Sequence, residues 1–416
     1  MRGRIWGRGL LLGAASILLG AQIAFGAGFA LYEGSARGNA MGGAMIGRGE
    51  DPSAVYYNPA GITDLPGLQM MGGMTAIIPS TDVKTAVGSA AERSTTSETN
   101  VWVPPHFYTT YQVNNSLWAG IGVFSQFGLG TEFDSKWPGK YNNYRAVIST
   151  VTINPNVALK LSDKLSVAAG VEAMYFDLDL RQAVQTGLAG VNLDQKLTGD
   201  SWGYGFNFAA RYKIFDWLAA GATYRSRVTQ NVGGNAEYTS NVPLGLLGLK
   251  NMTVKGDIVL PDMCSFGLTF YPTDKFSFEV SGVWNGWSSY NQLQVTYESG
   301  RQVTLPKHWH DTLRVQVGGE YKLTKWLDLR AGYTYDPEPS PDDWVDYLVP
   351  ANDRHLFSFG PGFHYKNYSL DLSYTYLVIT DRDVSNSNAL AGMGVLPTQF
   401  RNGDAHLIGV SVGYKF

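Results

Sequence analysis

The feature that most constrains this sequence is a strict two-residue alternation of side-chain character that recurs along its second half. From Leu313 to Leu323 every odd position is apolar or glycine, while the even positions carry charged side chains, an amide or glycine. The same alternation appears in residues 276–284, 327–333 and 408–416. Successive side chains of a β-strand point to opposite faces, so each stretch predicts a strand with one apolar and one polar face. The predicted apolar faces comprise Phe276, Phe278, Val280 and Trp284, then Leu313, Val315, Val317, Tyr321 and Leu323, then Leu327, Leu329, Ala331 and Tyr333, and finally Ile408, Val410, Val412, Tyr414 and Phe416.

The spacing of the connections predicts how many strands there are and what they build. Six short turns alternate with seven long polar segments, which implies 14 antiparallel strands. An even number of strands, with short connections at one end and long loops at the other, is typical of an outer-membrane β-barrel. A soluble two-sheet sandwich also alternates, but hairpins of such unequal length are unusual in it. The short turns are expected at 114–116, 163–164, 215–216, 272–275, 324–325 and 366–367, and the long segments at 78–101, 129–145, 182–201, 229–253, 286–309, 336–354 and 378–405.

Residues 1–26 have the pattern of a secretory signal peptide. Three arginines precede an apolar run from Leu10 to Leu19, and Ala24 and Gly26 supply the small residues that a signal peptidase reads. The alternative is a membrane anchor, but the apolar run is far shorter than the roughly 20 residues that span a bilayer. We therefore expect cleavage after Gly26 and a processed chain that begins at Ala27.

Charge and cysteine content narrow the class further. Without its signal peptide the chain has 29 basic and 35 acidic residues, a formal charge of -6, which argues against nucleic acid as a partner. The single cysteine, Cys264, excludes an internal disulfide. An exported chain of this length without disulfides needs another source of stability, and a closed membrane barrel provides one.

The segment from residue 27 to residue 66 has no place in the predicted wall, because the first barrel strand is expected to begin near Gly67. Residues 67–416 then form the barrel. A 14-stranded barrel is too wide for its own side chains to fill, so we expect residues 27–66 to form a plug, or hatch, inside it. The alternative is a disordered leader with an exposed turn. The plug side chains Arg37, Arg48, Glu50 and Asp51 are expected to pair with lumen-facing charges such as Glu172, Glu279, Arg314, Glu320 and Arg330.

Two short motifs within this framework call for a structural explanation. In "VYYNPAG", Pro59 fixes its own φ and biases Asn58 toward extended geometry, which predicts a rigid turn. The expected third strand reads "LWAGIGVFSQFGLG" and contains four glycines. Glycine permits a bulge or kink in a strand, but it also relieves crowding in a twisted wall, and the residues alone leave both readings open. These glycines are Gly120, Gly122, Gly128 and Gly130.

Several stretches, in order along the processed chain, resemble the FadL family of outer-membrane long-chain fatty acid and hydrocarbon channels. They are "AGFALYEGSARGNAMGGA", "EDPSAVYYNPAGIT", "FSQFGLGTEF", "LPDMCSFGL", "WHDTLRVQVGGEYKL" and "RAGYTYDPEPSPDDWVDYLVPANDRHLFSFGPGF". The resemblance implies a 14-stranded barrel, an N-terminal hatch whose gate includes Asn58, Pro59, Ala60 and Gly61, and a kinked third strand. It places a lateral opening at Phe127, Gly128 and Gly130.

The function implied by this resemblance is passive uptake of hydrophobic small molecules, either long-chain fatty acids or hydrocarbons. A ligand-gated hatch would control entry, and the ligand would leave sideways into the membrane lipid. Leaving through an aqueous pore would expose a long alkyl chain to water, at about 0.8 kcal/mol per methylene and more than about 10 kcal/mol in total. The resemblance also implies an outer-membrane location, and we expect a monomer without a cofactor.

A fatty carboxylate would need a basic partner inside the barrel. The neighbourhood of Arg181 contains Asp177 and Asp179, and His310 stands where a lysine would be expected, so the family's binding residues do not map one to one. A neutral aromatic or alkane ligand needs no such cation, and the sequence leaves both ligand classes open. The head-group candidates are Arg181, Lys307, His310 and Arg314.

Other functions find less support in the sequence. "HWHD", residues 308–311, places two histidines on one strand face, but no third metal ligand is evident nearby, so we expect no metal site. No grouping of serines and histidines identifies a catalytic triad, so we expect no enzyme activity. The principal alternative is a general diffusion porin or an adhesin for hydrophilic partners, in which an N-terminal plug would be unexplained.

Overall fold

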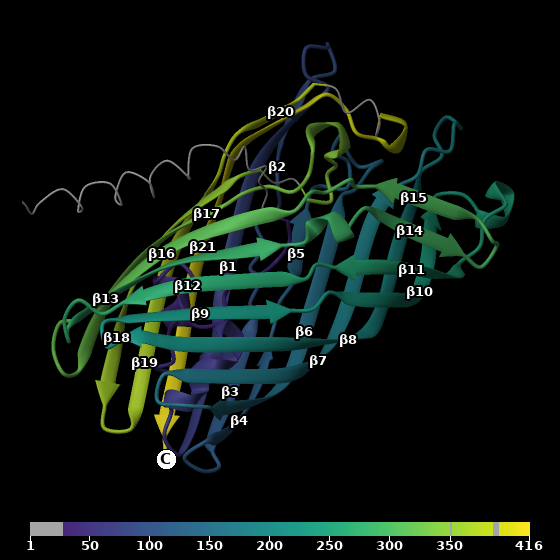
Figure 1. Cartoon of the computed structure of the whole chain (residues 1–416). Coiled ribbons are helices and arrows are strands. Elements are labelled where there is room, and N and C mark those ends of the chain that lie inside the picture. The colour runs from purple at the N-terminus through teal and green to yellow at the C-terminus, as the bar shows by residue number, and fades with distance from the viewer. Residues whose placement is uncertain (1–27, 350–351, 386–390) are drawn as a thin grey trace, which may run out of the picture.

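The structure is a computed structural model that describes residues 28–349, 352–385 and 391–416, so the predicted signal peptide, residues 1–26, lies outside the described residues. The chain forms a closed antiparallel β-barrel whose wall contains 14 strands within the described ranges (Figure 1). The first strand, β1 (Leu68–Thr85), pairs with β3 (Pro105–Gln112) on one side and with the last strand, β21 (Thr398–Lys415), on the other. Because first and last strands pair, the sheet closes on itself and leaves no open edge. The predicted fold class is confirmed.

Six of the wall strands are built from two consecutive segments each. The remaining wall elements, in order around the barrel, are β4 (Leu117–Phe124) with β5 (Gly128–Glu132), β6 (Arg145–Lys160), β7 (Leu165–Ala183), β8 (Leu193–Phe215), β9 (Leu218–Arg225) with β10 (Val228–Ser240), β11 (Met252–Leu260) with β12 (Met263–Phe270), β13 (Phe276–Asn285) with β14 (Gln292–Tyr297), β15 (Gln302–Pro306) with β16 (Thr312–Lys322), β17 (Leu327–Asp336), β18 (Arg354–Tyr365), and β19 (Tyr368–Ile379) with β20 (Arg382–Val384). Outside the wall, β2 (Arg93–Thr96) pairs with the end of β1, and the loops carry short 3-10 helices: η2 (Leu244–Leu247), η3 (Trp287–Ser289), η4 (Asp342–Trp344) and η5 (Ala391–Met393).

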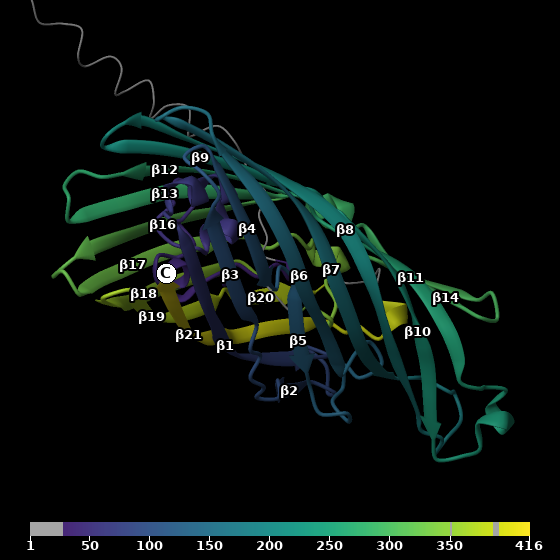
Figure 2. The ribbon, with the colours of Figure 1, turned by 90° about the horizontal axis from the view of Figure 1, so that it is seen from below.

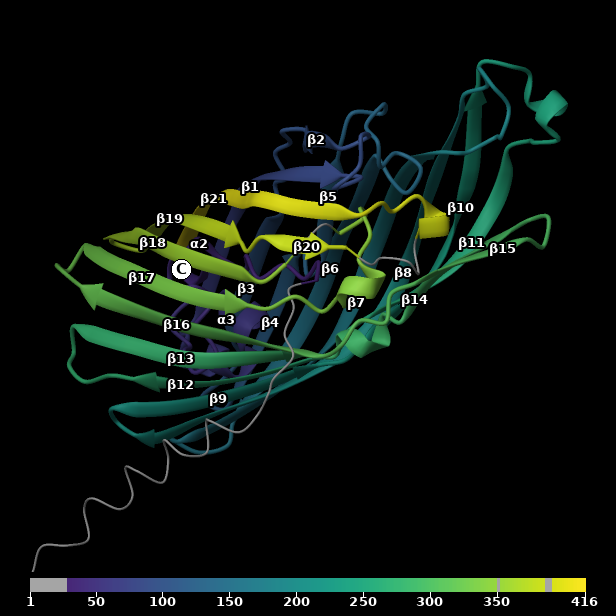
Figure 3. The same ribbon diagram turned by 90° about the horizontal axis from the view of Figure 1, so that it is seen from above.

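The six predicted short turns join neighbouring strands at one end of the barrel, and the long connections lie at the other end. Most of the predicted long loops were too long. Strands β10 and β11 extend into 229–253, and β14 and β15 occupy much of 286–309. Strands β1, β8 and β21 likewise extend into 78–101, 182–201 and 378–405. Figures 1 and 3 show β10, β11, β14 and β15 extending beyond the rest of the wall. Their polar residues resemble a loop in sequence, but the ladder between β10 and β11 satisfies the backbone whatever the side chains are.

The outer and inner faces of the wall follow the predicted alternation. In β16, Val315 and Val317 are 39% and 42% exposed on the outer face, whereas Arg314 and Glu320 are only 3% exposed and point inward. The outer apolar side chains would be costly in water and are suited to contact lipid. Within the described residues, no helix is long and apolar enough to cross a membrane.

The N-terminal segment, residues 28–66, lies inside the barrel as a run of short helices (Figure 2). These are α2 (Ala36–Ala40), α3 (Ala54–Tyr57) and the 3-10 helix η1 (Pro59–Asp64). Two predicted charge pairings with the wall are present: Arg37 lies 2.9 Å from Glu320, and Arg48 lies 3.9 Å from Glu279.

The other wall charges expected to meet the plug are paired differently. Glu172 forms an ion pair with Arg225 of β9, and Arg314 lies 3.1 Å from Asp336 of β17. Arg330 lies 2.7 Å from Glu320, beside Arg37. Buried charges are tolerated only when paired, and these charges are neutralised by nearby residues of the wall.

Candidate functional site

The third wall strand is interrupted at Ser125–Phe127, between β4 and β5. On one side β6 pairs with both segments, but on the other side β3 pairs only with β4. The free edge at the interruption is taken by the N-terminal segment. The Leu31 N–H donates to the Gln126 carbonyl at 2.8 Å, and the Gly128 N–H donates to the Phe29 carbonyl at 3.0 Å. Residues 29–31, at the start of the N-terminal segment, therefore replace β3 as the backbone partner at the start of β5.

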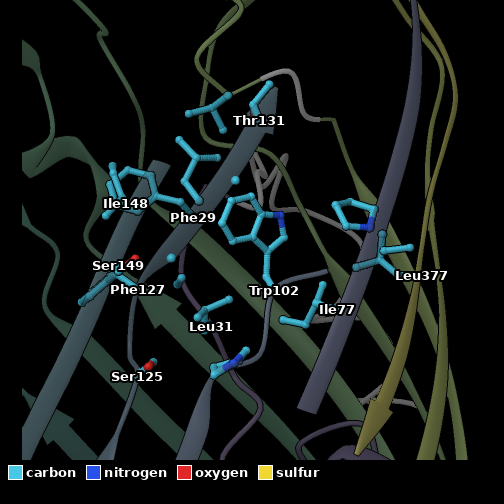
Figure 4. A pocket seen from close by; sticks show the side chains of 18 of the residues that line it. Phe29, Leu31, Ile77, Trp102, Ser125, Phe127, Thr131, Ile148, Ser149 and Leu377 are labelled. Atoms are coloured by element: carbon cyan, nitrogen blue, oxygen red, sulfur yellow. The ribbon is translucent and has the colours of Figure 1, made fainter. Parts of the chain in front are cut away.

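A cavity of about 370 Å³ lies in the gap between β5 and the strands β1 and β3. Figure 4 shows Phe29, Phe127 and Ile148 on one side of it and Ile77 on the other, with Trp102 between them. Its lining includes side chains from both faces of the wall. Ile148 of β6 is buried and points inward, whereas Val151 of the same strand is 40% exposed and points outward. The cavity thus lies along a discontinuity in the wall, and its lining is largely apolar.

Phe29 holds the first residues of the N-terminal segment in an apolar cluster beside this cavity. Its ring centroid lies 4.9 Å from that of Trp287, 5.6 Å from Tyr290 and 5.8 Å from Trp309. It also lies 6.1 Å from Phe127 at the strand break. Aromatic rings in such tilted and edge-on arrangements attract one another beyond simple burial. The segment is therefore bound to the break through both its backbone and Phe29.

The glycines of the third strand are explained by close approach of other groups. A Cβ added at Gly120 or Gly122 would lie 3.0 Å from Val55 of α3. One added at Gly128 would lie 2.8 Å from Leu31, and one at Gly130 would overlap the Trp102 indole. The β4 pair makes room for the plug, and the β5 pair makes room for residues that line the cavity. The strand break falls between the two pairs.

Asn58 connects the two short helices α3 and η1. The sequence had predicted an isolated turn at this position. Asn58 itself is extended, with φ -157° and ψ 96°, as Pro59 predicts. Its Oδ1 accepts the Ala60 N–H at 3.0 Å, and its Nδ2 donates to the carbonyls of Ile46 at 2.7 Å and Ala210 at 3.1 Å. Four and six residues are too few to produce helical periodicity in a sequence, so α3 and η1 escaped prediction. The motif fastens the plug to itself and to β8.

Arg181 does not face the lumen, contrary to the sequence-based expectation. In β7 the even-numbered Phe176 and Leu180 are buried inside, and the odd-numbered Val171 is 62% exposed outside. Arg181 shares the outer face with Val171, and its guanidinium lies 2.7 Å from Asp179. It thus belongs to an ion cluster on the outside of the wall. The physical reason is that polarity inverts along β7. In its later part the outer face carries Asp179 and Arg181, and the inner face packs against the Phe29 cluster.

The other three head-group candidates lie closer to the interior. Lys307, which is 1% exposed, forms an ion pair with Asp346. His310 is half-buried, and this burial lowers the pKa of its imidazole, which favours the neutral form. Arg314 lies inside the barrel, with its guanidinium 3.8 Å from the ring centroid of Tyr32 in the N-terminal segment. Arg314 is thus the candidate that contacts the N-terminal segment.

Two residues of this region were not predicted. Arg354 of β18 lines the cavity and lies 2.7 Å from Asp336, so that Asp336 joins it to Arg314. Glu33 lies beside Arg314 in the N-terminal segment. In β18 Leu356 is buried and Phe357 is exposed, so the alternation predicts that Arg354 points inward. In the sequence, Arg354 falls in the predicted loop 336–354, to which this alternation was not applied.

Comparisons with known proteins agree with this architecture. The family described as "Outer membrane protein transport protein (OMPP1/FadL/TodX)" matches residues 17–416. The 47 kDa outer membrane protein of Pasteurella multocida is 26% identical, with 98% of each chain covered. The long-chain fatty acid transport protein of Escherichia coli K12 is also 26% identical, with 97% of each chain covered.

Solved structures show the same fold. A Pseudomonas aeruginosa FadL homologue matches with a TM-score of 0.82 and 19% identity, covering 94% of this chain and 100% of that one. The Pseudomonas putida toluene transporter TodX matches with a TM-score of 0.72 and 18% identity, covering 92% and 98%. The closed barrel and these relatives place the protein in the outer membrane of a Gram-negative bacterium. The chain belongs to the OMPP1/FadL/TodX family of outer-membrane transport proteins.

Proposed function

We propose that the protein is a channel for passive uptake of hydrophobic molecules, long-chain fatty acids or hydrocarbons, across the outer membrane. The observation that carries this proposal is the apolar cavity at the break in the third strand, which is lined from both faces of the wall. Family membership supports it as well, since relatives include a protein named for long-chain fatty acid transport and one named for toluene transport. Binding and passage of such ligands involve no covalent chemistry.

In this proposal residues 27–66 act as a hatch and Phe127, Gly128 and Gly130 border a lateral exit. A ligand that enters from the long-loop side competes with Phe29 for the apolar cluster around Trp287. Binding shifts the hatch only if the ligand has higher affinity for the displaced state than for the resting one. The turn from Asn58 to Gly61 holds the rest of the hatch in place. The movement of the hatch is therefore limited to its first residues, which lie beside β5.

The lateral route has an energetic basis. Each methylene transferred from an apolar site to water costs about 0.8 kcal/mol, so an alkyl chain that left through an aqueous pore would face a barrier above about 10 kcal/mol. A molecule that passes between β3 and β5 moves from an apolar cavity directly into lipid. The outward-pointing Val151 supports this route, because it lies at the mouth of the cavity.

The test is a Gly128→Trp variant. A Cβ at Gly128 already approaches Leu31, so an indole there fills the gap between the hatch and the wall. We expect cells that depend on this protein to lose uptake of a radiolabelled hydrophobic substrate, while barrel assembly and surface binding stay intact. Gly233→Trp is the matched control, because Gly233 lies in a wall strand with no atom within 4 Å of an added Cβ.

Normal transport by Gly128→Trp would show that passage is axial. A steady open pore of the purified wild-type protein in a planar bilayer would favour the diffusion-porin alternative over the hatch. Both measurements use the full chain in a membrane.

A further inference from the structure

The lumen wall holds a compact cluster in which two cations share one carboxylate. Asp336 of β17 lies 3.1 Å from Arg314 of β16 and 2.7 Å from Arg354 of β18. Arg314 is 3% exposed, and its Nε has no hydrogen-bond partner among the described residues. The Asp336 Oδ1 likewise has no donor among the described residues. A buried cationic donor without an acceptor is unfavourable, so the Arg314 Nε is suited to receive another anionic oxygen.

Glu33 of the N-terminal segment lies next to this cluster. It lines a small cavity of about 10 Å³ together with Arg314, and the preceding residue, Tyr32, covers the Arg314 guanidinium. The carboxylate accepts the Tyr32 N–H at 2.9 Å. Burial raises the pKa of Glu33, and the charges of Arg314 and Arg354 oppose this increase. When Glu33 is ionised, it and the three wall residues carry no net charge.

The next carboxylate along the chain, Glu338, also lies near the cluster, because its charge and that of Arg354 attract each other. Glu338 is 3% exposed and accepts a hydrogen bond from the Ser340 hydroxyl at 2.6 Å. Arg382 donates to the Ser340 carbonyl at 2.6 Å. Burial raises the pKa of Glu338, and the charges of Arg382 and Arg354 oppose this increase. Glu33 is the carboxylate that the N-terminal segment contributes beside Arg314.

The cluster is continuous with the lateral cavity. Arg354 lines that cavity, as do Phe29 and Leu31. Glu33 lies two residues after Leu31, whose N–H bonds to the strand break. A ligand whose alkyl chain occupies the cavity therefore has the Arg354 cation within its reach. Arg354 belongs to the cluster beside which Glu33 lies.

We propose that Glu33 is an internal substitute for a ligand carboxylate, and that the carboxylate of a fatty acid replaces it at the Arg314–Asp336–Arg354 cluster and thereby releases residues 28–33 from β5. The inference rests on the proposed uptake function. Exchange of one carboxylate for another leaves the charge of the cluster unchanged, so no buried cation is left unpaired. Burial of the alkyl chain then favours the exchanged state. A neutral ligand lacks the group needed to displace Glu33.

The test compares palmitate with methyl palmitate, which has the same chain and no charge. Glu33→Gln keeps the shape and the acceptor for the Tyr32 N–H, but leaves the cluster one negative charge short. We expect this variant to bind palmitate about tenfold more tightly than the wild type, the effect of one added charge-assisted contact. Methyl palmitate should bind both proteins within about twofold. Glu50→Gln is the control, because Glu50 lies in the same segment but pairs with Arg37 at 2.9 Å.

A second measurement uses the wild-type protein and does not depend on the variant. Hydrogen exchange of the amides of residues 28–35 should increase when palmitate is added and should stay unchanged with methyl palmitate. Equal exchange with both ligands overturns the inference, as does a folded Glu33→Gln variant with unchanged palmitate affinity. If Glu33→Gln binds palmitate and methyl palmitate more tightly by the same factor, the inference is also overturned. That result would mean that the substitution loosens the plug without any role for the ligand carboxylate. If the wild type binds neither ligand, the uptake function itself fails.

Discussion

The orientation of β16 leads to a prediction that compares two adjacent positions. Val317 lies in the middle of the strand, opposite Val280 of β13 and Tyr333 of β17, and is 42% exposed on the outer face. An arginine on the lipid face near the bilayer midplane costs about 2 to 4 kcal/mol. Val317→Arg should therefore change the unfolding equilibrium constant by roughly 30-fold to 1000-fold. The assay is guanidinium unfolding in phospholipid vesicles, followed by tryptophan fluorescence.

Gln316→Arg is the matched variant, one residue away and on the opposite face. Gln316 is 2% exposed because Gly43 of the N-terminal segment covers it, so a larger side chain there costs about 1 to 3 kcal/mol of local overpacking. That cost falls on the plug, which lies in a polar lumen, and the barrel itself should assemble and unfold as the wild type does. Equal losses of barrel stability in the two variants, or none in Val317→Arg, would refute the assignment of the two faces.

Three further predictions follow from the plug and from β7. Protease added to intact cells should cut only the long loops, and cleavage between Val55 and Gly61 would contradict an internal plug. Deletion of Asn58–Ala60 removes the contacts to Ile46 and Ala210, and it should impair uptake or give a leaky pore in planar bilayers, whereas normal uptake with a closed pore would exclude a gating role. Arg181→Gln should leave palmitate affinity within about twofold of the wild type, and a selective loss for palmitate over its methyl ester would show that Arg181 contacts the ligand.

The barrel was predictable because its information is local. Alternation and turn spacing each depend on a few neighbouring residues, and they predicted the strand count, the ends of the strands at the short turns and the outer face of β16. The extended strands β10, β11, β14 and β15 were less accessible to prediction. Outside the membrane neither face of a strand must be apolar, so a polar hairpin has the composition of a loop.

The candidate site was less predictable because its parts come from distant segments. Arg314, Asp336 and Arg354 lie on three different strands, and Glu33 comes from the other end of the chain. Each of these residues is ordinary in its own sequence context. Their proximity depends on the register of the wall and on where the plug enters it, and neither quantity is encoded in a short window.

The error at Arg181 has a physical basis that applies to any strand that leaves the membrane. In the run from Asp177 to Arg181, charged residues alternate with Leu178 and Leu180, and the rule for a lipid-facing wall would turn the leucines outward. Here the outer face carries the Arg181–Asp179 ion pair, and Leu180 belongs to the apolar cluster inside, with Phe29 and Trp287. The barrel is therefore apolar on its outer face along one band of the wall and apolar on its inner face where the proposed ligand path runs. The inversion along β7 marks the transition between these two environments, at the height where the third strand is interrupted.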